Sequence, residues 1–158
     1  MNKNIEIERK FLVKNDTFKE KAISKERIVQ AYLSTDPKRT IRVRIKGNQA
    51  FLTIKGKTNH IGTTRFEWEK VIEVSEAESL LPLCLPFPIE KERYIVKYKG
   101  FSYEVDVFFG NNEGLVLAEL ELDNENQFFE KPDWLGEEVT GKKEYYNSFL
   151  SSVMPTNY

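Results

Sequence analysis

The chain has 158 residues, and 31% of them are charged although the formal net charge is only −1. This length favours a single domain spanning residues 1–158. A near balance of interspersed charges argues against a basic surface for nucleic acid, and no apolar run reaches the length of a membrane helix. We therefore expect neither a nucleic acid nor a membrane as a partner.

Cysteine and histidine each occur once, as Cys84 and His60. A single cysteine cannot form an internal disulfide, which fits a reducing, cytoplasmic location. His60 lies in a loop-like Thr-Asn-His-Ile-Gly stretch, so we expect neither a histidine-based metal site nor a catalytic triad. A metal ion in this protein would therefore be held by oxygen ligands.

Most of the chain alternates polar and apolar residues with the period of a β-strand. In the first such run, Ile5–Val13, one face carries Glu6, Glu8 and Lys10, and apolar side chains dominate the other. Similar runs cover residues 27–34, 41–46, 51–55, 64–74, 91–99, 103–109 and 115–123. Turn residues such as Gly47-Asn48 separate them. The pattern predicts an antiparallel meander of about eight strands, an α+β fold that is mainly β.

Short helices are predicted at several places around these strands. One begins after Asn15-Asp16-Thr17, and another begins at the capping-box pair Ser75 and Glu78. A third covers residues 126–131 and is followed by a loop over residues 132–136. The last helix begins near Lys143, and its apolar face consists of Tyr145, Phe149, Leu150 and Val153.

The charged residues gather on one face of almost every predicted strand. Periodicity alone leaves two arrangements, an open sheet with this face in solvent or a closed barrel with this face lining a tunnel. Two features favour the tunnel. The cations are mostly arginine, which suits bidentate phosphate contacts, and the acids form E-x-E or E-x-D pairs whose carboxylates repel each other at ~6–7 Å. The carboxylates are Glu6, Glu8, Glu67, Glu69, Glu104, Asp106, Glu119 and Glu121, and the cations are Lys10, Arg42, Arg44, Lys55, Arg65, Lys91 and Arg93.

This combination of acids and bases predicts a site for a polyphosphate chain. Carboxylates without a cysteine or histidine cluster indicate Mg²⁺ or Mn²⁺ as the cofactor. Metal ions bridge phosphate oxygens and orient water, while arginine and lysine neutralise the charge that develops during phosphoryl transfer. The sequence has no G-x-x-x-x-G-K-[ST] loop, which excludes a P-loop enzyme.

The order of these motifs resembles the CYTH family, the triphosphate tunnel metalloenzymes. Glu6-x-Glu8-x-Lys10 looks like the E-x-E-x-K signature of that family, and further blocks follow in the family's order across nearly the whole chain. These blocks are Gln30-Ala31-Tyr32-Leu33, Arg42-x-Arg44, Thr53-x-Lys55, Arg65-x-Glu67-x-Glu69, Lys91-x-Arg93-Tyr94, Glu104-Val105-Asp106-Val107-Phe108, Glu119-x-Glu121 and Glu137-Glu138-Val139-Thr140. The resemblance implies an eight-stranded closed antiparallel β-barrel around a tunnel, with divalent-metal-dependent action on triphosphates.

The resemblance also implies roles for individual residues. The metal ligands would be Glu6, Glu8, Asp106, Glu119 and Glu121. The phosphate ligands would be Lys10, Arg42, Arg44, Lys55, Arg65, Lys91 and Arg93. A second metal site or a water-orienting group would come from Glu67, Glu69 and Glu104, with an ion-pair role as the alternative for Glu104. Tyr32 resembles the tyrosine that family members pair with the signature lysine, here Lys10.

Two points stay open at this level. Lys10 either binds phosphate or, at alkaline pH, acts as a general base, and we therefore predict an alkaline optimum for hydrolysis. In the family the last helix gates one tunnel mouth, and an acid and an arginine often precede its tyrosine. In this chain Lys142 and Glu144 occupy those places before Tyr145, so the contact of this helix with substrate is an open question.

The sequence thus predicts a metal-dependent triphosphatase that hydrolyses inorganic tripolyphosphate, the typical substrate of the short bacterial members that it resembles, to pyrophosphate and phosphate. The alternatives are hydrolysis of thiamine or nucleoside triphosphates, adenylyl cyclase chemistry of the class IV type, and a polyphosphate-binding module without activity. The chain shows no base-recognition motif for a cyclase, and simple anion binding would not need so many carboxylates. The partner is expected to be a small-molecule triphosphate, and the protein a monomer or homodimer.

Overall fold

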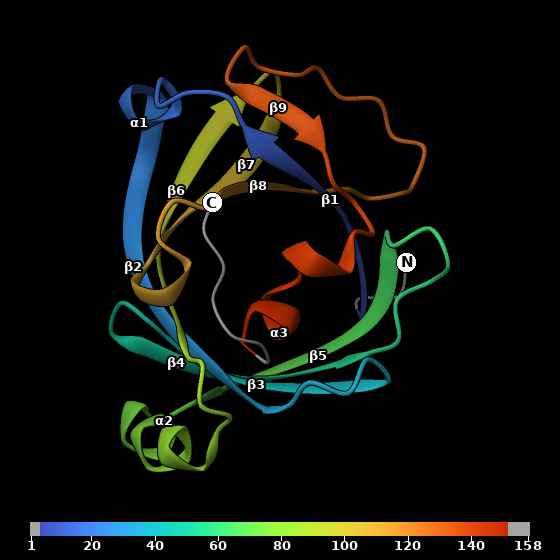
Figure 1. Ribbon diagram of the computed structural model, residues 1–158. Helices are drawn as coiled ribbons and strands as arrows, with labels where there is room; N and C mark the ends of the chain where they lie inside the picture. The colour runs from blue at the N-terminus through green and yellow to red at the C-terminus, as the bar shows by residue number, and fades with distance from the viewer. Residues whose placement is uncertain (1–3, 152–158) are drawn as a thin grey trace.

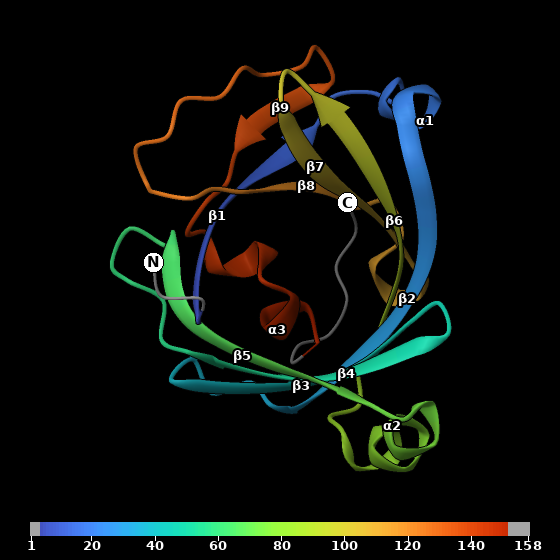
Figure 2. The same cartoon turned by 180° about the vertical axis from the view of Figure 1, so that it is seen from behind.

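The computed structural model describes residues 4–151, and nearly all of its regular structure is β-strand. The strands form a ring when viewed from either side in Figures 1 and 2. They are β1 Ile5–Val13, β2 Ala22–Ser34, β3 Arg39–Lys46, β4 Gln49–Gly56, β5 Thr64–Ile72, β6 Ile89–Tyr98, β7 Phe101–Phe109, β8 Val116–Glu121 and β9 Leu135–Glu138. The α-helices are α1 Phe18–Lys21, α2 Val74–Leu80 and α3 Asn147–Leu150.

Strand β1 closes the barrel by pairing with three other strands. The antiparallel order runs β5-β4-β3-β2-β6-β7-β8-β1, and β1 pairs back to β5 through Ile5–Ile7. Further along the same edge of β1, Phe11–Val13 pairs with β9 instead. The predicted closed barrel is therefore confirmed, with eight strands in the ring and β9 as an additional strand.

Strand β9 corrects the loop that was predicted over residues 132–136. It occupies the part of the β1 edge that β5 leaves free. Gly136 permits this pairing, because a Cβ atom at that position would lie 2.9 Å from the Leu12 carbonyl oxygen. Strand β9 therefore forms because part of the β1 edge is free. The four residues of β9 show no alternation that would predict a strand.

The short helices differ from the predictions in detail. No helix forms over residues 126–131, which are irregular, and the Glu130 carbonyl there accepts a hydrogen bond from the Tyr103 hydroxyl. Strand β2 begins at Ala22 and not at residue 27. The capping box of α2 uses Glu73 and Glu76, since Ser75 already lies within the first helical turn.

The C-terminal helix is also shorter than predicted. A 3₁₀ turn over Lys143–Tyr145 precedes α3, and Val153, which was assigned to the apolar face of this helix, lies outside the described residues. Both views show α3 and the segment just before it within the outline of the barrel ring (Figures 1 and 2). None of the helices formed by residues 4–151 is long and apolar enough to span a bilayer.

The largest apolar core lies outside the barrel wall. The outward faces of β1, β6, β7 and β8 pack against α1, β9 and the segment that precedes β9. Its centre is aromatic: the rings of Phe18 and Tyr94 lie 5.3 Å apart, and those of Tyr103 and Trp134 lie 5.5 Å apart, in edge-to-face contact. A smaller cluster joins α2 to the outward faces of β3 and β4. With these apolar faces buried outside, the opposite faces are left to line the interior of the barrel, here called the lumen.

The lumen changes character along the barrel axis. At one end an apolar cluster fills it, and its members are Tyr32, Ile89, Phe108, Leu115, Leu117, Val139 and Leu150. Two residues further along β8 and β6, the inward side chains become charged, with Glu119 following Leu117 and Lys91 following Ile89. The charged faces predicted from sequence therefore line only part of the lumen, and the apolar cluster together with α3 closes the rest.

Candidate active site

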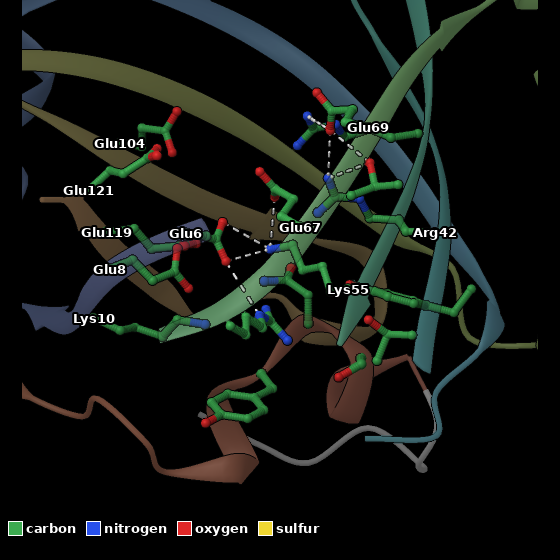
Figure 3. Close-up of a pocket in the computed structure, with 18 of the residues that line it drawn as sticks. Glu6, Glu8, Lys10, Arg42, Lys55, Glu67, Glu69, Glu104, Glu119 and Glu121 are labelled. Carbon is green, nitrogen blue, oxygen red and sulfur yellow. Dashed lines mark hydrogen bonds and ion pairs between the residues drawn. The ribbon is translucent and has the colours of Figure 1, made fainter. Parts of the chain in front are cut away.

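A cavity of about 180 Å³ occupies the charged part of the lumen (Figure 3). Of the candidate site residues from the sequence, these line it: Glu6, Glu8, Lys10, Tyr32, Arg42, Arg44, Lys55, Arg65, Glu67, Glu69, Lys91, Arg93, Glu104, Glu119 and Glu121. Asp106 does not. Thr53, from the Thr53-x-Lys55 block, also lines the cavity, and the structure adds residues that the sequence patterns did not single out, namely Thr40, Tyr146, Asn147 and Ser148.

Strand register brings the acidic residues together on one side of the cavity. Lys10 and Glu8 of β1 lie opposite Glu119 and Glu121 of β8, and Glu104 of β7 lies on the other flank of Glu119. Figure 3 shows these carboxylates along one wall, at a distance from Arg42. We call Glu8, Glu104, Glu119 and Glu121 the acidic side of the lumen.

The carboxylates of the acidic side perturb one another strongly. Burial and the neighbouring carboxylates of Glu119 and Glu6 raise the pKa of Glu8 well above its usual value. Burial would also raise the pKa of Glu119, but Lys10 and a hydrogen bond from Glu8 hold it well below the usual value. The pKa values of the two neighbouring carboxyl groups are thus shifted in opposite directions. Burial and the charges of Glu6, Glu67 and Glu104 also raise the pKa of Glu121. This side of the lumen carries more negative charge than its own cations neutralise.

Glu6 differs from this group because it is fully paired. The Lys55 ammonium donates to both of its carboxylate oxygens, at 3.0 and 3.1 Å, and the Arg65 Nε atom donates at 3.3 Å. Burial alone would raise the pKa of Glu6, but these two cations overcome it and lower that pKa to about 2. Lys55 also lies 3.4 Å from Glu67. The pair of Glu6 and Lys55 therefore bridges the acidic side and the rest of the lumen.

The opposite wall carries an excess of positive charge, and we call Arg42, Arg44, Lys91 and Arg93 the basic side. Glu69 accepts hydrogen bonds from the Thr53 hydroxyl at 2.7 Å and from Arg42 and Arg44 at 3.4 and 3.5 Å. The Nε atoms of both arginines are nevertheless buried without a hydrogen-bond partner among residues 4–151. Burial and the neighbouring arginines lower the pKa of Arg44 to about 10. Buried donors without acceptors are costly, so this wall is suited to an oxyanion.

The Asp106 carboxylate, which the resemblance assigned to the metal ligands, is buried beside two cations of the basic side. Arg93 donates to its two oxygens at 2.7 and 2.9 Å, and the Lys91 ammonium lies 2.7 Å away. Burial alone would raise the pKa of Asp106, but Arg93 and Lys91 lower it to about 2. In this structure Asp106 anchors two cations of the basic side, and both of its oxygens are engaged.

Matches to known proteins agree with this geometry. The family model described as the CYTH domain matches residues 4–155. The chain belongs to the CYTH domain family. Two curated relatives are each named inorganic triphosphatase. The one from Acetivibrio thermocellus is 46% identical over 147 residues, which is 92% of each chain. The one from Nitrosomonas europaea is 39% identical over 155 residues, covering 95% of this chain and 99% of the relative.

A solved structure is similar to this CYTH protein over nearly its whole length. The crystal structure of an inorganic triphosphatase superposes with a TM-score of 0.70 at 36% sequence identity. The match covers 95% of this chain and 99% of that one. The barrel described above is thus the fold of a solved triphosphatase.

The C-terminal segment of this CYTH protein enters the lumen, which the sequence patterns did not reveal. The Lys10 ammonium donates to the Tyr145 carbonyl at 3.1 Å and lies 5.4 Å from the centre of the Tyr146 ring. The Asn147 side-chain oxygen accepts from the Lys91 ammonium at 3.1 Å and from the Gln30 amide at 3.2 Å. Oxygen atoms of this segment thus accept hydrogen bonds from Lys10 and Lys91, which the resemblance assigned to phosphate binding.

Two further sequence expectations concern this segment. Tyr32 was predicted to pair with Lys10; it lies in the apolar cluster and lines the cavity, while the Lys10 ammonium contacts residues 145 and 146. Lys142 and Glu144, which replace the family's usual acid and arginine, are both exposed. Lys142 pairs with Glu137 at 3.5 Å on the surface. Their substitution therefore leaves the lining of the cavity unchanged.

The donor chemistry of the acidic side fits a hard divalent cation. Among residues 4–151, no three histidine, cysteine, aspartate or glutamate side chains are gathered into a ready-made metal site. Glu8 and Glu119 nevertheless place two half-buried carboxyl groups in contact, and a divalent cation between them would offset their mutual repulsion. Glu121 and Glu104 supply further oxygen atoms to the same cavity. Glu6 would join them by leaving its ion pair with Lys55.

Proposed function

We propose that this protein hydrolyses inorganic tripolyphosphate to pyrophosphate and phosphate with a divalent cation, Mg²⁺ or Mn²⁺. One observation carries the proposal: a single lumenal cavity has an acidic side with too few cations and a basic side with unpaired buried donors. A metal-bound polyphosphate supplies both missing charges at once. The two relatives named inorganic triphosphatase support the same substrate class.

The acidic side would hold the metal. Glu8, Glu119 and Glu121 are the proposed ligands, with Glu6 joining them and Glu104 available for a second ion or for water. When bound, the ion lowers the charge on phosphate oxygens and favours ionisation of a water molecule. We propose that Asp106 serves as the anchor of Lys91 and Arg93 and not as a metal ligand, because both of its oxygens are already engaged.

The cations would bind the phosphate chain. Arg42 and Arg44 offer the unpaired Nε donors, and Lys91 and Arg93 are held in position by Asp106. The remaining members of this group are Lys10, Lys55 and Arg65, with Glu67 and Glu69 orienting them through ion pairs. Lys10 acts in this scheme as a hydrogen-bond donor to phosphate, which is the role it already has toward the Tyr145 carbonyl. Tyr32 contributes to the wall at the apolar end.

The proposal is tested by phosphate release from tripolyphosphate, ATP and thiamine triphosphate, each with Mg²⁺, with Mn²⁺ and with a chelator. We expect tripolyphosphate to be the best substrate, with no release in the chelator. Cyclic AMP and pyrophosphate from ATP would replace the proposal with adenylyl cyclase chemistry. Polyphosphate binding without turnover of any substrate would leave a binding module. A cytoplasmic location and a monomeric or homodimeric state stay predictions from the sequence.

A further inference from the structure

A second cavity, of about 410 Å³, adjoins the lumenal cavity at the end where the C-terminal segment enters. The turn between β2 and β3, the loop between β4 and β5, and residues 141–149 line it. Four residues line both cavities, and they are Thr40, Arg65, Tyr146 and Ser148. The two cavities are therefore separated only by the side chains and backbone of a thin layer of residues.

Tyr146 belongs to this layer, and we call Tyr146 together with the adjacent Asn147, which lines the lumenal cavity, the partition. The Tyr146 ring lies 5.4 Å from the Lys10 ammonium and 5.9 Å from the Arg65 guanidinium, so cations from two strands contact it. Asn147 is fixed by its two hydrogen bonds from Gln30 and Lys91. The partition thus contacts two of the lysines that are proposed to bind the phosphate chain.

Neighbouring contacts hold the partition in place. On its C-terminal side Leu150 belongs to the apolar cluster, and the Ser151 hydroxyl donates to the Phe87 carbonyl at 2.6 Å. On its N-terminal side Gly141 packs against the β4–β5 loop so closely that a Cβ atom on Gly62 would lie 2.3 Å from the Gly141 Cα atom. The partition is therefore a supported part of the lumen wall.

The charges at the two ends of the lumen favour extension of a polyphosphate chain toward one end only. Four basic residues line the second cavity, namely Lys57, His60, Arg65 and Lys143, and its described lining contains no aspartate or glutamate. The opposite end of the lumen opens into a cavity of about 360 Å³ that is lined by Glu104, Glu121 and Asp123, and its described lining contains no lysine, arginine or histidine. An anion is repelled at the acidic end and attracted at the basic one.

We propose that Tyr146 and Asn147 determine the length of the polyphosphate that this protein accepts. With the partition in place, the lumenal cavity ends at the segment that carries Tyr146. Without the Tyr146 ring, the two cavities become one, and the basic second cavity binds the fourth and later phosphates of a linear inorganic polyphosphate. This inference rests on the proposed function and adds the specificity of the same site for chain length.

The test compares tetrapolyphosphate with tripolyphosphate in the Y146A variant and in wild-type protein. We expect the ratio of kcat/KM for tetrapolyphosphate to that for tripolyphosphate to rise at least about tenfold in Y146A, through a lower KM for the longer chain. Y146F keeps the ring and should keep the wild-type ratio. F128A, which removes an exposed aromatic side chain outside both cavities, serves as the matched surface control.

The second cavity is tested in the same background. Adding K57A and K143A to Y146A should return the ratio toward the wild-type value, because these lysines supply the attraction for the added phosphates. If Y146A fails to fold, as judged by its melting temperature, Y146L removes the ring contacts while keeping an apolar side chain.

Three outcomes would overturn the inference. One is an unchanged ratio in folded Y146A or Y146L. Another is an increase for ATP without an increase for tetrapolyphosphate, which would assign the second cavity to an organic group. The third is a ratio that does not respond to the lysine substitutions. Calorimetric binding of both polyphosphates gives the same ratio without turnover, so a protein that hydrolyses nothing would refute the proposed function and leave the partition testable.

Discussion

The charged groups on the acidic and basic sides of the lumen lack part of their pairing, whereas the buried ion pairs around them are complete. Asp106 is buried with two cations, and every charge of that group has a partner. On the acidic side, Glu8 and Glu119 are half-buried, and each carboxyl group has the other as a close neighbour. On the basic side, the Nε atoms of Arg42 and Arg44 lack acceptors. Charges in complete pairs thus stabilise the fold, whereas we propose that the incompletely paired charges bind ligands.

This difference predicts which substitutions affect stability and which affect activity. Removing a member of a complete buried pair leaves an uncompensated charge, so the cost falls on folding. Removing a charge from an incomplete group relieves repulsion or an unpaired donor, so the cost falls on ligand binding. Substitutions in the complete pairs should therefore lower mainly stability, whereas substitutions in the incomplete groups should lower mainly activity. The sizes of these effects test the distinction.

The largest effect is expected from D106N. An uncharged amide leaves Lys91 and Arg93 buried without their shared carboxylate, and breaking such a pair costs about 3–5 kcal/mol. The free energy of unfolding, measured by urea titration, should fall by that amount, while the Mg²⁺ concentration for half-maximal activity should stay near the wild-type value.

The control for D106N is E104Q on the same strand. Glu104 contacts Arg93 at 3.4 Å but is partly exposed, so its loss should cost much less stability. A stable D106N protein with a strongly raised Mg²⁺ requirement would restore Asp106 to the metal ligands and remove the distinction drawn above.

The next effect is expected from E119Q. This change removes the central carboxylate of the acidic side, to which Glu8 donates and beside which Lys10 lies. We expect kcat to fall at least about 100-fold, similar to the loss of one strong electrostatic contact in an active site. Stability should change little, since the repulsion with Glu8 is relieved. Steady-state phosphate release over a range of Mg²⁺ concentrations and a urea titration measure the two quantities.

E92Q provides the matched control for E119Q. Glu92 lies on the outward face of β6, pairs with Lys25 and does not line the lumenal cavity. Its replacement should leave phosphate release unchanged. Equal activity of E119Q and wild-type protein would contradict the assignment of metal binding to the acidic side.

A smaller effect is expected from R44A on the basic side. The substitution removes a buried Nε donor that has no acceptor among residues 4–151 and one long contact of 3.5 Å with Glu69, so folding should lose little. A charge-assisted hydrogen bond to phosphate is worth about 1.5–3 kcal/mol, and the KM for tripolyphosphate should therefore rise about tenfold or more. R44K keeps the charge without the planar fork and should give an intermediate KM. An unchanged KM in R44A would show that phosphate does not reach this arginine.

The strand pattern predicted the face of each charged residue but not its depth or its neighbours. The period of two correctly assigned Glu104 and Asp106 to the same face of β7. Their separation into a cavity residue and a buried anchor depends on the register, which places Asp106 opposite Arg93 and Leu117. Register follows from pairing between distant segments, and alternation within one strand does not contain it.

The additional parts of the molecule were missed for related reasons. Strand β9 exists because β1 has a free edge, and its Leu135–Glu138 sequence has no strand period of its own. Tyr146 and Asn147 enter the lumen because Leu150 packs into the apolar cluster, a long-range contact that a four-residue helix does not reveal. Local propensity describes such short elements poorly, since tertiary packing determines where they lie.

The smallest effect is expected from an ion pair on the outside of the barrel, between Arg9 of β1 and Glu138 of β9. Two hydrogen bonds of 2.7 and 2.6 Å join them, yet both side chains are more than a quarter exposed. The hydrogen bond from Arg9 lowers the pKa of Glu138. After allowance for solvent screening, E138Q should cost about 0.5–1 kcal/mol at pH 7.

The pH dependence of this cost distinguishes the pair from the lumenal charges. Because the pKa of Glu138 is lower in the folded protein, its contribution is present above the unfolded value of ~4.3 and is lost as the pH falls through the folded value. The difference in unfolding free energy between wild-type protein and E138Q should therefore shrink as the pH falls below that unfolded value, as measured by urea titration at several pH values. E137Q, which removes an exposed neighbour, should show no such trend. A difference that persists at acid pH would mean that Glu138 stabilises β9 by packing and not by its charge.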